Sequence, residues 1–154
     1  YMTRENAFYQ RIKLLCGDWE SYNEWLDTYL EIEDPLSDIL IKLIDCRNDI
    51  KETLHQLNLY CLEKPFDEES VYNRLREELY NKYEQNQITK DGAVSALHRI
   101  SQNIPFGSDF QIYCNVLSDY YDLAINKIVN MKKFDDNFKK WLKNGGKIDW
   151  DTML

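Results

Sequence analysis

The sequence contains few of the residues that interrupt regular secondary structure. Only 5 glycines and 3 prolines occur among 154 residues, too few for the turns of a many-stranded sheet or for a glycine-rich loop that cradles phosphates. Long apolar runs are also missing, and the mean hydropathy is −0.62, which argues against a membrane protein. The hydrophobic share of 44% is too high for a disordered chain. We therefore expect a globular protein, which at this length needs neither a disulfide nor a metal to fold.

The four cysteines match no metal-ligand or redox motif. Cys16, Cys46, Cys61 and Cys114 are widely and unevenly spaced, so we interpret them as buried thiols and predict no metal and no cofactor. The N-terminal residues do not have the pattern of a signal peptide, and a cytoplasmic location is expected. Tyr1 precedes Met2, which we take as the natural start, and the predicted domain is therefore a single one over residues 2–154.

Apolar residues recur at intervals of three and four throughout the chain, which predicts an all-α domain of about eight helices. In the first half, we expect Thr3 to cap the first helix and Gly17 to end it, and Ser21 with Glu24 to form a capping box. Further helix starts are predicted at Asp34-Pro35 and at Asp49 with Glu52.

In the second half, Pro65 interrupts the chain and the acidic residues 67–69 predict the first turn of the next helix. Thr89 is expected to cap a shorter helix, and Asp109 to start a longer one after the loop at 103–108. A last helix is predicted over residues 134–143. The tail beyond it contains Trp150, which we expect to fold back onto the protein.

The excess negative charge is concentrated in one half of the chain. The formal net charge is −8; residues 1–70 contain 16 acidic and 7 basic side chains, whereas residues 71–154 contain 11 and 12. Such a balance removes the usual electrostatic attraction to nucleic acid and to anionic membranes, so neither is expected as a direct partner. A basic protein would instead be attracted.

Within the acidic half, the second predicted helix, together with Glu20 just before its cap at Ser21, carries a stripe of carboxylates. At 100° per residue, Glu20, Glu24, Asp27 and Glu31 fall on one side, opposite an apolar face. Like charges four residues apart destabilise a helix, and no Lys or Arg occurs between Cys16 and Ile41 to offset them. A solvated surface and a docking surface for a basic partner both fit this stripe. The partner-binding residues predicted from it are Asp18, Trp19, Glu20, Glu24, Asp27, Glu31, Glu33 and Asp34.

No catalytic residue is predicted, because His55 and His98 each lie at the edge of the apolar face of a predicted helix and are interpreted as structural. The alternative enzyme hypothesis is an all-helical hydrolase that acts on nucleotides and holds a divalent metal with carboxylates. Its first candidates for metal ligands are Asp119 and Asp122. A third hypothesis is an acidic mimic of nucleic acid that antagonises a DNA-binding protein.

Two segments accompany this acidic, helical pattern: Asp34-Pro35-Leu36-Ser37-Asp38-Ile39 and Ser118-Asp119-Tyr120-Tyr121-Asp122-Leu123-Ala124. In overall style the chain resembles the helical immunity proteins encoded beside bacterial polymorphic and contact-dependent inhibition toxins. The resemblance implies a cytoplasmic inhibitor that binds one cognate toxin domain, often a basic nuclease, and blocks its active site. It assigns no individual residues.

Overall fold

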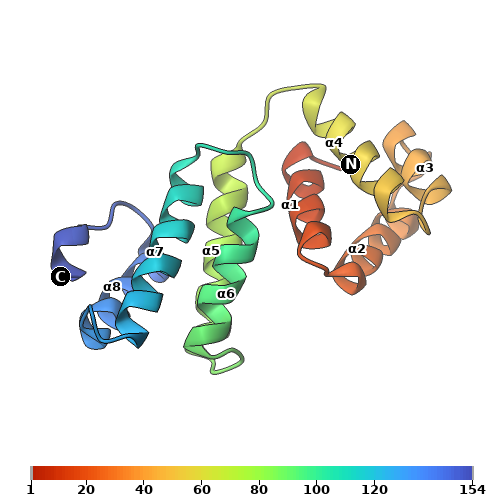
Figure 1. The fold of residues 1–154 in the computed structure, drawn as a ribbon. Helices are drawn as coiled ribbons and strands as arrows, with labels where there is room; N and C mark the ends of the chain where they lie inside the picture. Colours follow the sequence, from red (N-terminus) through yellow and green to blue (C-terminus); the bar gives the residue numbers. More distant parts are fainter. Residues whose placement is uncertain (1, 154) are drawn as a thin grey trace. The chain divides into compact units, whose positions relative to one another are not determined.

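The computed structural model describes residues 2–153 and confirms the all-α prediction. These residues form eight α-helices and a short 3₁₀ helix, and they include no strand (Figure 1). The chain divides after Val71 into two compact units, which are described in turn. The one-domain organisation remains a prediction. Tyr1, interpreted above as preceding the natural start, and Leu154 lie outside the described residues.

The first unit contains four helices: α1 (Arg4–Leu15), α2 (Trp19–Ile32), α3 (Asp38–Asp45) and α4 (Ile50–Leu62). Helix α1 packs against α2 and α4, and α3 packs against α2 and α4. The fully buried side chains at the centre are Ala7, Ile12, Tyr22, Leu26, Leu40, Leu43, Thr53 and Leu57. The helices therefore bury the apolar stripes that their spacing predicted.

The junction between α1 and α2 shows how local chemistry sets the helix ends. The backbone N–H of Gly17 donates to the Leu14 carbonyl, and that of Asp18 donates to the Lys13 carbonyl. Gly17 has a φ of +94°, a conformation that glycine adopts without the steric cost of a side chain, so this is a Schellman end. Gly17 thus ends α1 as predicted.

Two predicted helix starts in the first unit are wrong. Helix α2 begins at Trp19 rather than at Ser21, because the Asp18 carboxylate accepts the Ser21 backbone N–H and so acts as the N-cap. Helix α3 begins at Asp38, three residues after Pro35. There Ser37, not Asp34, has the extended backbone of an N-cap (φ −68°, ψ 158°). The caps predicted at Thr3 and Asp49 are confirmed.

Helix α5 (Glu68–Glu84) follows the break at Pro65 and continues into the second unit. That unit also contains α6 (Lys90–Ser101), α7 (Asp109–Ile125), α8 (Met131–Asn144) and the 3₁₀ helix η1 (Trp150–Met153). Thr89 caps α6 as predicted. The last helix starts three residues earlier than predicted, because Asn130 supplies its N-cap by accepting the Lys133 backbone N–H.

Aromatic stacking and one buried arginine hold the second unit together. Tyr72 of α5 stacks on Phe110 of α7 with ring centroids 5.0 Å apart. Arg76 of α5 is 5% exposed and donates to the backbone carbonyls of Trp141 and Leu142, at the end of α8. Trp150 stacks on Tyr120 at 5.5 Å, so the tail folds back as expected.

Candidate functional site

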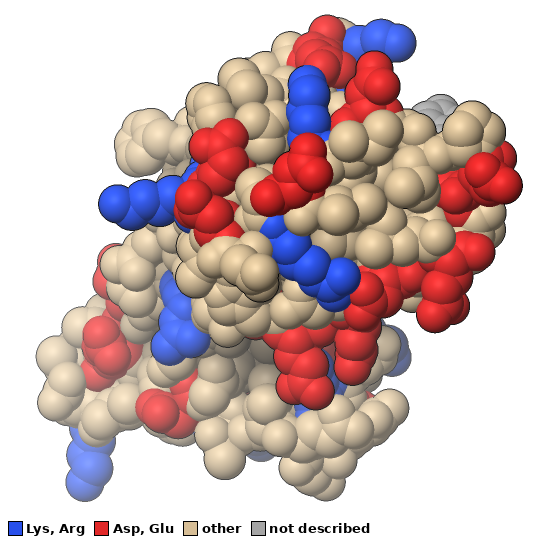
Figure 2. All heavy atoms as spheres, turned by 90° about the vertical axis from the view of Figure 1, so that its right-hand side faces the viewer, with Lys and Arg blue, Asp and Glu red and all other residues tan. Residues whose placement is uncertain are grey.

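The predicted acidic stripe lies on the surface of α2. Glu20, Glu24, Asp27 and Glu31 are all exposed, whereas Tyr22 and Leu26 on the other side of the helix are fully buried. Figure 2 shows the side of the molecule on which α2, α3 and α4 lie in Figure 1, with several groups of Asp and Glu side chains and fewer Lys and Arg side chains. The four stripe residues therefore lie on the solvent-exposed side of α2.

A run of aromatic contacts fixes the α2 backbone beneath the stripe. The ring of Trp19 meets that of Tyr22 edge-on at 5.5 Å, Tyr22 lies 5.7 Å from Trp25, and Trp25 meets Tyr29 edge-on at 5.3 Å. Such tilted pairs add stability beyond the area that they bury. All four rings belong to α2, so these contacts support the helix itself, while the buried Tyr22 and Leu26 pack it into the first unit.

Arg47 neutralises one member of the stripe. This residue lies in the turn between α3 and α4, and its Nη2 is 2.7 Å from Oδ1 of Asp27. Its Nε also donates to the side-chain oxygen of Asn23 at 3.3 Å. Sequence reasoning missed Arg47, since twenty positions separate it from Asp27 and no local pattern joins them. Glu20, Glu24 and Glu31 are therefore the stripe residues that form no ion pair among residues 2–153.

The other acidic residues predicted for the site occupy different settings. Asp18 is half-buried: besides capping α2, its Oδ2 lies 3.6 Å from Nζ of Lys13. Glu33 is the half-buried C-cap residue of α2, and one of its carboxylate oxygens is buried without a hydrogen-bond partner in the described part of the chain. Asp34 is exposed in the connection to α3. Asp18 therefore stabilises the start of α2, whereas Asp34 faces solvent.

Trp19 borders a shallow hollow beside the stripe. The hollow has a volume of about 480 Å³ and is lined by Trp19, Asn23, Arg47, Asn48 and Ile50. Trp19 is half-buried, and Ile50, the first residue of α4, is 47% exposed. Of these five residues, only Trp19 was predicted from the sequence as a partner-binding residue. Its position at the edge of the apolar face of the helix indicated that role.

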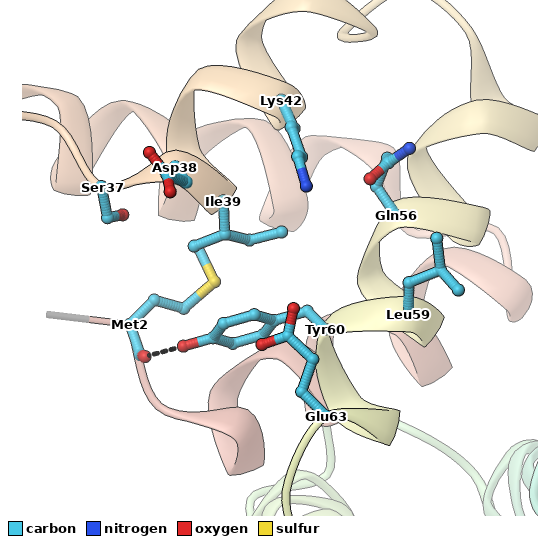
Figure 3. Close-up of a pocket in the computed structure, with 9 residues that line it drawn as sticks. All are labelled: Met2, Ser37, Asp38, Ile39, Lys42, Gln56, Leu59, Tyr60 and Glu63. Carbon is cyan, nitrogen blue, oxygen red and sulfur yellow. Dashed lines mark hydrogen bonds between the residues drawn. The ribbon is translucent and has the colours of Figure 1, made fainter.

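A second and more enclosed pocket of about 250 Å³ lies between the start of α3, the end of α4 and Met2 (Figure 3). Its lining residues are Met2, Ser37, Asp38, Ile39, Lys42, Gln56, Leu59, Tyr60 and Glu63. The Tyr60 hydroxyl donates to the Met2 carbonyl at 2.6 Å, and Lys42 points into the space bounded by Ile39 and Leu59 (Figure 3). Acidic, basic and apolar groups are mixed in its lining.

The residues proposed for the alternative hydrolase are not joined by further ligand side chains in the described part of the chain. Asp119 and Asp122 are both exposed on α7. In the part of the chain that the structure describes, no group of three or more His, Cys, Asp or Glu side chains is placed to hold a metal ion.

Two of the four thiols are unsuited to nucleophilic chemistry. Cys46, Cys61 and Cys114 are buried as expected, whereas Cys16 is only half-buried. Burial raises the pKa of Cys61 to about 11, against the opposing effect of Arg11 and Arg4, and it raises the pKa of Cys114 well above its usual value. These two thiols stay protonated near neutral pH, where the thiolate is the reactive form.

Comparisons with known protein families, curated proteins and solved structures found no match. Between residues 2 and 153, no helix has the length and apolar character needed to cross a bilayer.

Proposed function

We propose that this chain is a protein-binding inhibitor that docks a basic protein on the α2 stripe. The proposal depends on the exposure and the ion pairing of Glu20, Glu24 and Glu31. All three are exposed on one side of one helix, and none forms an ion pair with any residue between 2 and 153.

The packing of α2 does not depend on these carboxylates, although Glu20 lies in the first turn, where an acidic side chain complements the helix dipole. Their mutual repulsion costs α2 roughly 0.2–0.5 kcal/mol for each pair four residues apart, and the apolar face of α2 is packed without them. A partner bearing Lys and Arg relieves that repulsion and is steered by the opposite charge. Steering of this kind raises association rates by about 10- to 1,000-fold at low salt.

The partner class follows from the resemblance to immunity proteins of bacterial toxin systems. Such an inhibitor acts in the cytoplasm, binds one cognate toxin domain and catalyses nothing. A basic nuclease domain fits the charge of the stripe, because the groove with which a nuclease binds nucleic acid is itself basic. The stripe would cover that groove.

A nucleic-acid mimic uses the same charges but needs them over an extended face. Helix α2 has 14 residues, which corresponds to a length of about 21 Å. One short stripe suits a compact contact with a single protein better than imitation of a long duplex.

The test is co-expression of this chain with the products of the genes beside its own, followed by purification of any complex. The expected result is a one-to-one complex with a basic domain that loses its toxic activity, and association that slows as salt rises. A complex whose association is indifferent to salt would contradict docking on the stripe. A rise in melting temperature with Mg²⁺ or Mn²⁺, without any protein partner, would favour the hydrolase and make Asp119 the first residue to change.

A further inference from the structure

The pocket between the start of α3 and the end of α4 has a fixed floor. The Tyr60 hydroxyl donates to the Met2 carbonyl at 2.6 Å, and the Arg4 guanidinium lies 4.4 Å from the centre of the Tyr60 ring. Nη2 of Arg4 also lies 2.9 Å from Oε2 of Glu63. Because these contacts hold Tyr60 and Glu63 in place before any ligand arrives, a ligand that binds there has little side-chain freedom to remove.

Opposite charges line this pocket without pairing with each other. Lys42 extends into it from α3, and Glu63 lines it from the end of α4 (Figure 3). Lys42 forms no ion pair with any residue from 2 to 153. Within the same part of the chain, Glu63 is paired through Oε2 only. The pocket therefore offers an occupant one ammonium group and one carboxylate oxygen.

Gln56 adds a neutral acceptor. Its Nε2 donates to Oε1 of Glu52 at 2.7 Å, and Figure 3 shows its carbonyl oxygen turned toward the pocket. Asp38, exposed at the start of α3, is a second carboxylate in the lining. The N–H groups of a ligand ammonium thus have several oxygen acceptors within the lining.

The remaining walls are apolar, and the space that they enclose is small. Met2 and Ile39 are 1% and 8% exposed, and Leu59 is 44% exposed. The volume of about 250 Å³ is below the roughly 300–1,000 Å³ of pockets that bind drug-sized ligands. The space suits a ligand with one branched aliphatic group.

The charge of the surrounding chain favours a ligand without net charge. Residues 1–70 contain 16 acidic and 7 basic side chains, so a simple anion is repelled from this part of the protein. A simple cation would leave Lys42 facing it without an anionic partner. A zwitterion avoids both costs.

We propose that this pocket binds a small apolar α-amino acid, such as leucine, in its zwitterionic form. Lys42 donates to the ligand carboxylate, and Glu63 and Gln56 accept from its ammonium group. The aliphatic chain lies against Ile39 and Leu59. None of the eight residues predicted to bind a partner lines the pocket, so this binding activity is separate from docking on the stripe and does not depend on it.

The test titrates four compounds into the ¹⁵N-labelled full-length chain and follows the backbone amide resonances of the lining residues. Leucine is compared with 4-methylpentanoate, which lacks the ammonium group, with 3-methylbutylamine, which lacks the carboxylate, and with glycine, which lacks the side chain. We expect leucine to bind with a Kd of about 1 mM or lower. Each of the other compounds should bind at least about tenfold more weakly, because each lacks either a charge-assisted hydrogen bond or the buried aliphatic group.

A matched pair of lysine variants locates the carboxylate. Lys42→Met should weaken leucine binding at least about tenfold but should not weaken binding of 3-methylbutylamine, which has no carboxylate for Lys42 to bond. Retained binding of this amine also shows that the variant is folded. Lys51→Met is the control, because Lys51 is exposed on α4 and does not line the pocket. It should leave both affinities unchanged.

The opposite results would overturn the proposal. Equal binding of leucine and 4-methylpentanoate would show an anion site, and equal binding of leucine and 3-methylbutylamine would show a cation site. Equal effects of the two lysine variants, or the absence of leucine binding, would also overturn it. None of these results bears on the α2 stripe, whose test uses a protein partner.

Discussion

Arg47 and Asp27 form an ion pair of 2.7 Å between the α3–α4 turn and helix α2. The pair joins two parts of the first unit that are distant in sequence, and it also sets the Arg47 side of the hollow. Asp27 therefore differs from the other carboxylates of the stripe: it belongs to the fold as well as to the acidic surface.

The contribution of this pair to stability should be small. The side chains of Arg47 and Asp27 are 32% and 55% exposed, and exposed pairs contribute about 0.2–1 kcal/mol. A double-mutant cycle with Arg47→Met and Asp27→Asn, measured by urea unfolding, should give a coupling energy in that range. A coupling above about 2 kcal/mol would mean that the pair is a principal support of the first unit.

Tyr22→Phe should not weaken the protein at neutral pH. The Tyr22 hydroxyl is buried without a hydrogen-bond partner in the described chain, so removing it should leave the free energy of unfolding unchanged or raise it by about 1 kcal/mol. Tyr29→Phe on the same helix is the matched control. The Tyr29 hydroxyl accepts a hydrogen bond from Asn6 at 3.2 Å, and its loss should cost about 0.5–1.5 kcal/mol.

The same substitution should also change the response to alkaline pH. Burial, followed by the nearby Cys46, raises the pKa of Tyr22 well above its usual value, while Arg47 lowers it. Above about pH 10, an unfolded tyrosine releases its proton and the folded one keeps it, so stability falls as pH rises. The advantage of Tyr22→Phe over the parent should therefore be greater at about pH 11 than at about pH 8. An advantage that is constant with pH would mean that the hydroxyl ionises equally in both states.

Arg76→Met should destabilise the second unit. Its guanidinium bonds to the carbonyls at the end of α8, and Gly145 leaves room for it, since a Cβ there would lie 3.1 Å from Nε. The Trp141 carbonyl keeps the backbone N–H of Gly145 as a donor, whereas the Leu142 carbonyl loses its bond to Arg76. A carbonyl left unpaired in a buried place costs about 1–3 kcal/mol. Arg74→Met, two positions earlier on α5, is the control. That side chain is 47% exposed, and its loss should cost less than about 0.5 kcal/mol.

Truncation of core leucines should show how far the two units depend on each other. Leu40 in the first unit and Leu117 in the second are both fully buried, and changing either to Ala should cost about 2–5 kcal/mol. Leu62→Ala, at a 73% exposed position, should cost little. If the chain is a single domain as predicted, either core variant should lower the midpoint temperature of one shared thermal transition. Two separate transitions, only one of which moves in each variant, would contradict it.

Fold class and most helix ends could be predicted because they depend on neighbours in the sequence. Thr3, Asp49 and Thr89 cap helices through bonds to residues three positions on, and apolar spacing identified the buried faces. In the first unit, the errors occurred where two local signals competed, whereas in the second the Asn130 cap of α8 was missed. Ser21 and Asp18 are both good cap residues, and the Schellman end at Gly17 places Asp18 where α2 starts. Ser37 likewise takes the position expected for Asp34.

The candidate site could be predicted only in part, for the same reason. The stripe follows from the helical period alone, and its exposure agrees with that period. The pairing of Arg47 with Asp27 depends on how the α3–α4 turn packs beside α2, which no spacing reveals. Ile50 and Asn48 join Trp19 by the same packing. Residues brought together by tertiary structure were therefore missed.

The most direct test of docking on the stripe is the association rate of the partner with a charge-reversed chain. Glu20, Glu24 and Glu31 are changed to Lys, while Asp27 is kept because it pairs with Arg47. A control carries the same change of charge at Asp119, Asp122 and Asp136, which are exposed in the second unit. The partner in this experiment is the basic protein that co-purifies with the chain. Stopped-flow measurements at low salt should show that the first variant associates with it at least about tenfold more slowly than the parent does. The control should stay within about twofold of the parent, because steering depends on charge near the contact. Equal rates for the two variants would contradict docking on the α2 stripe.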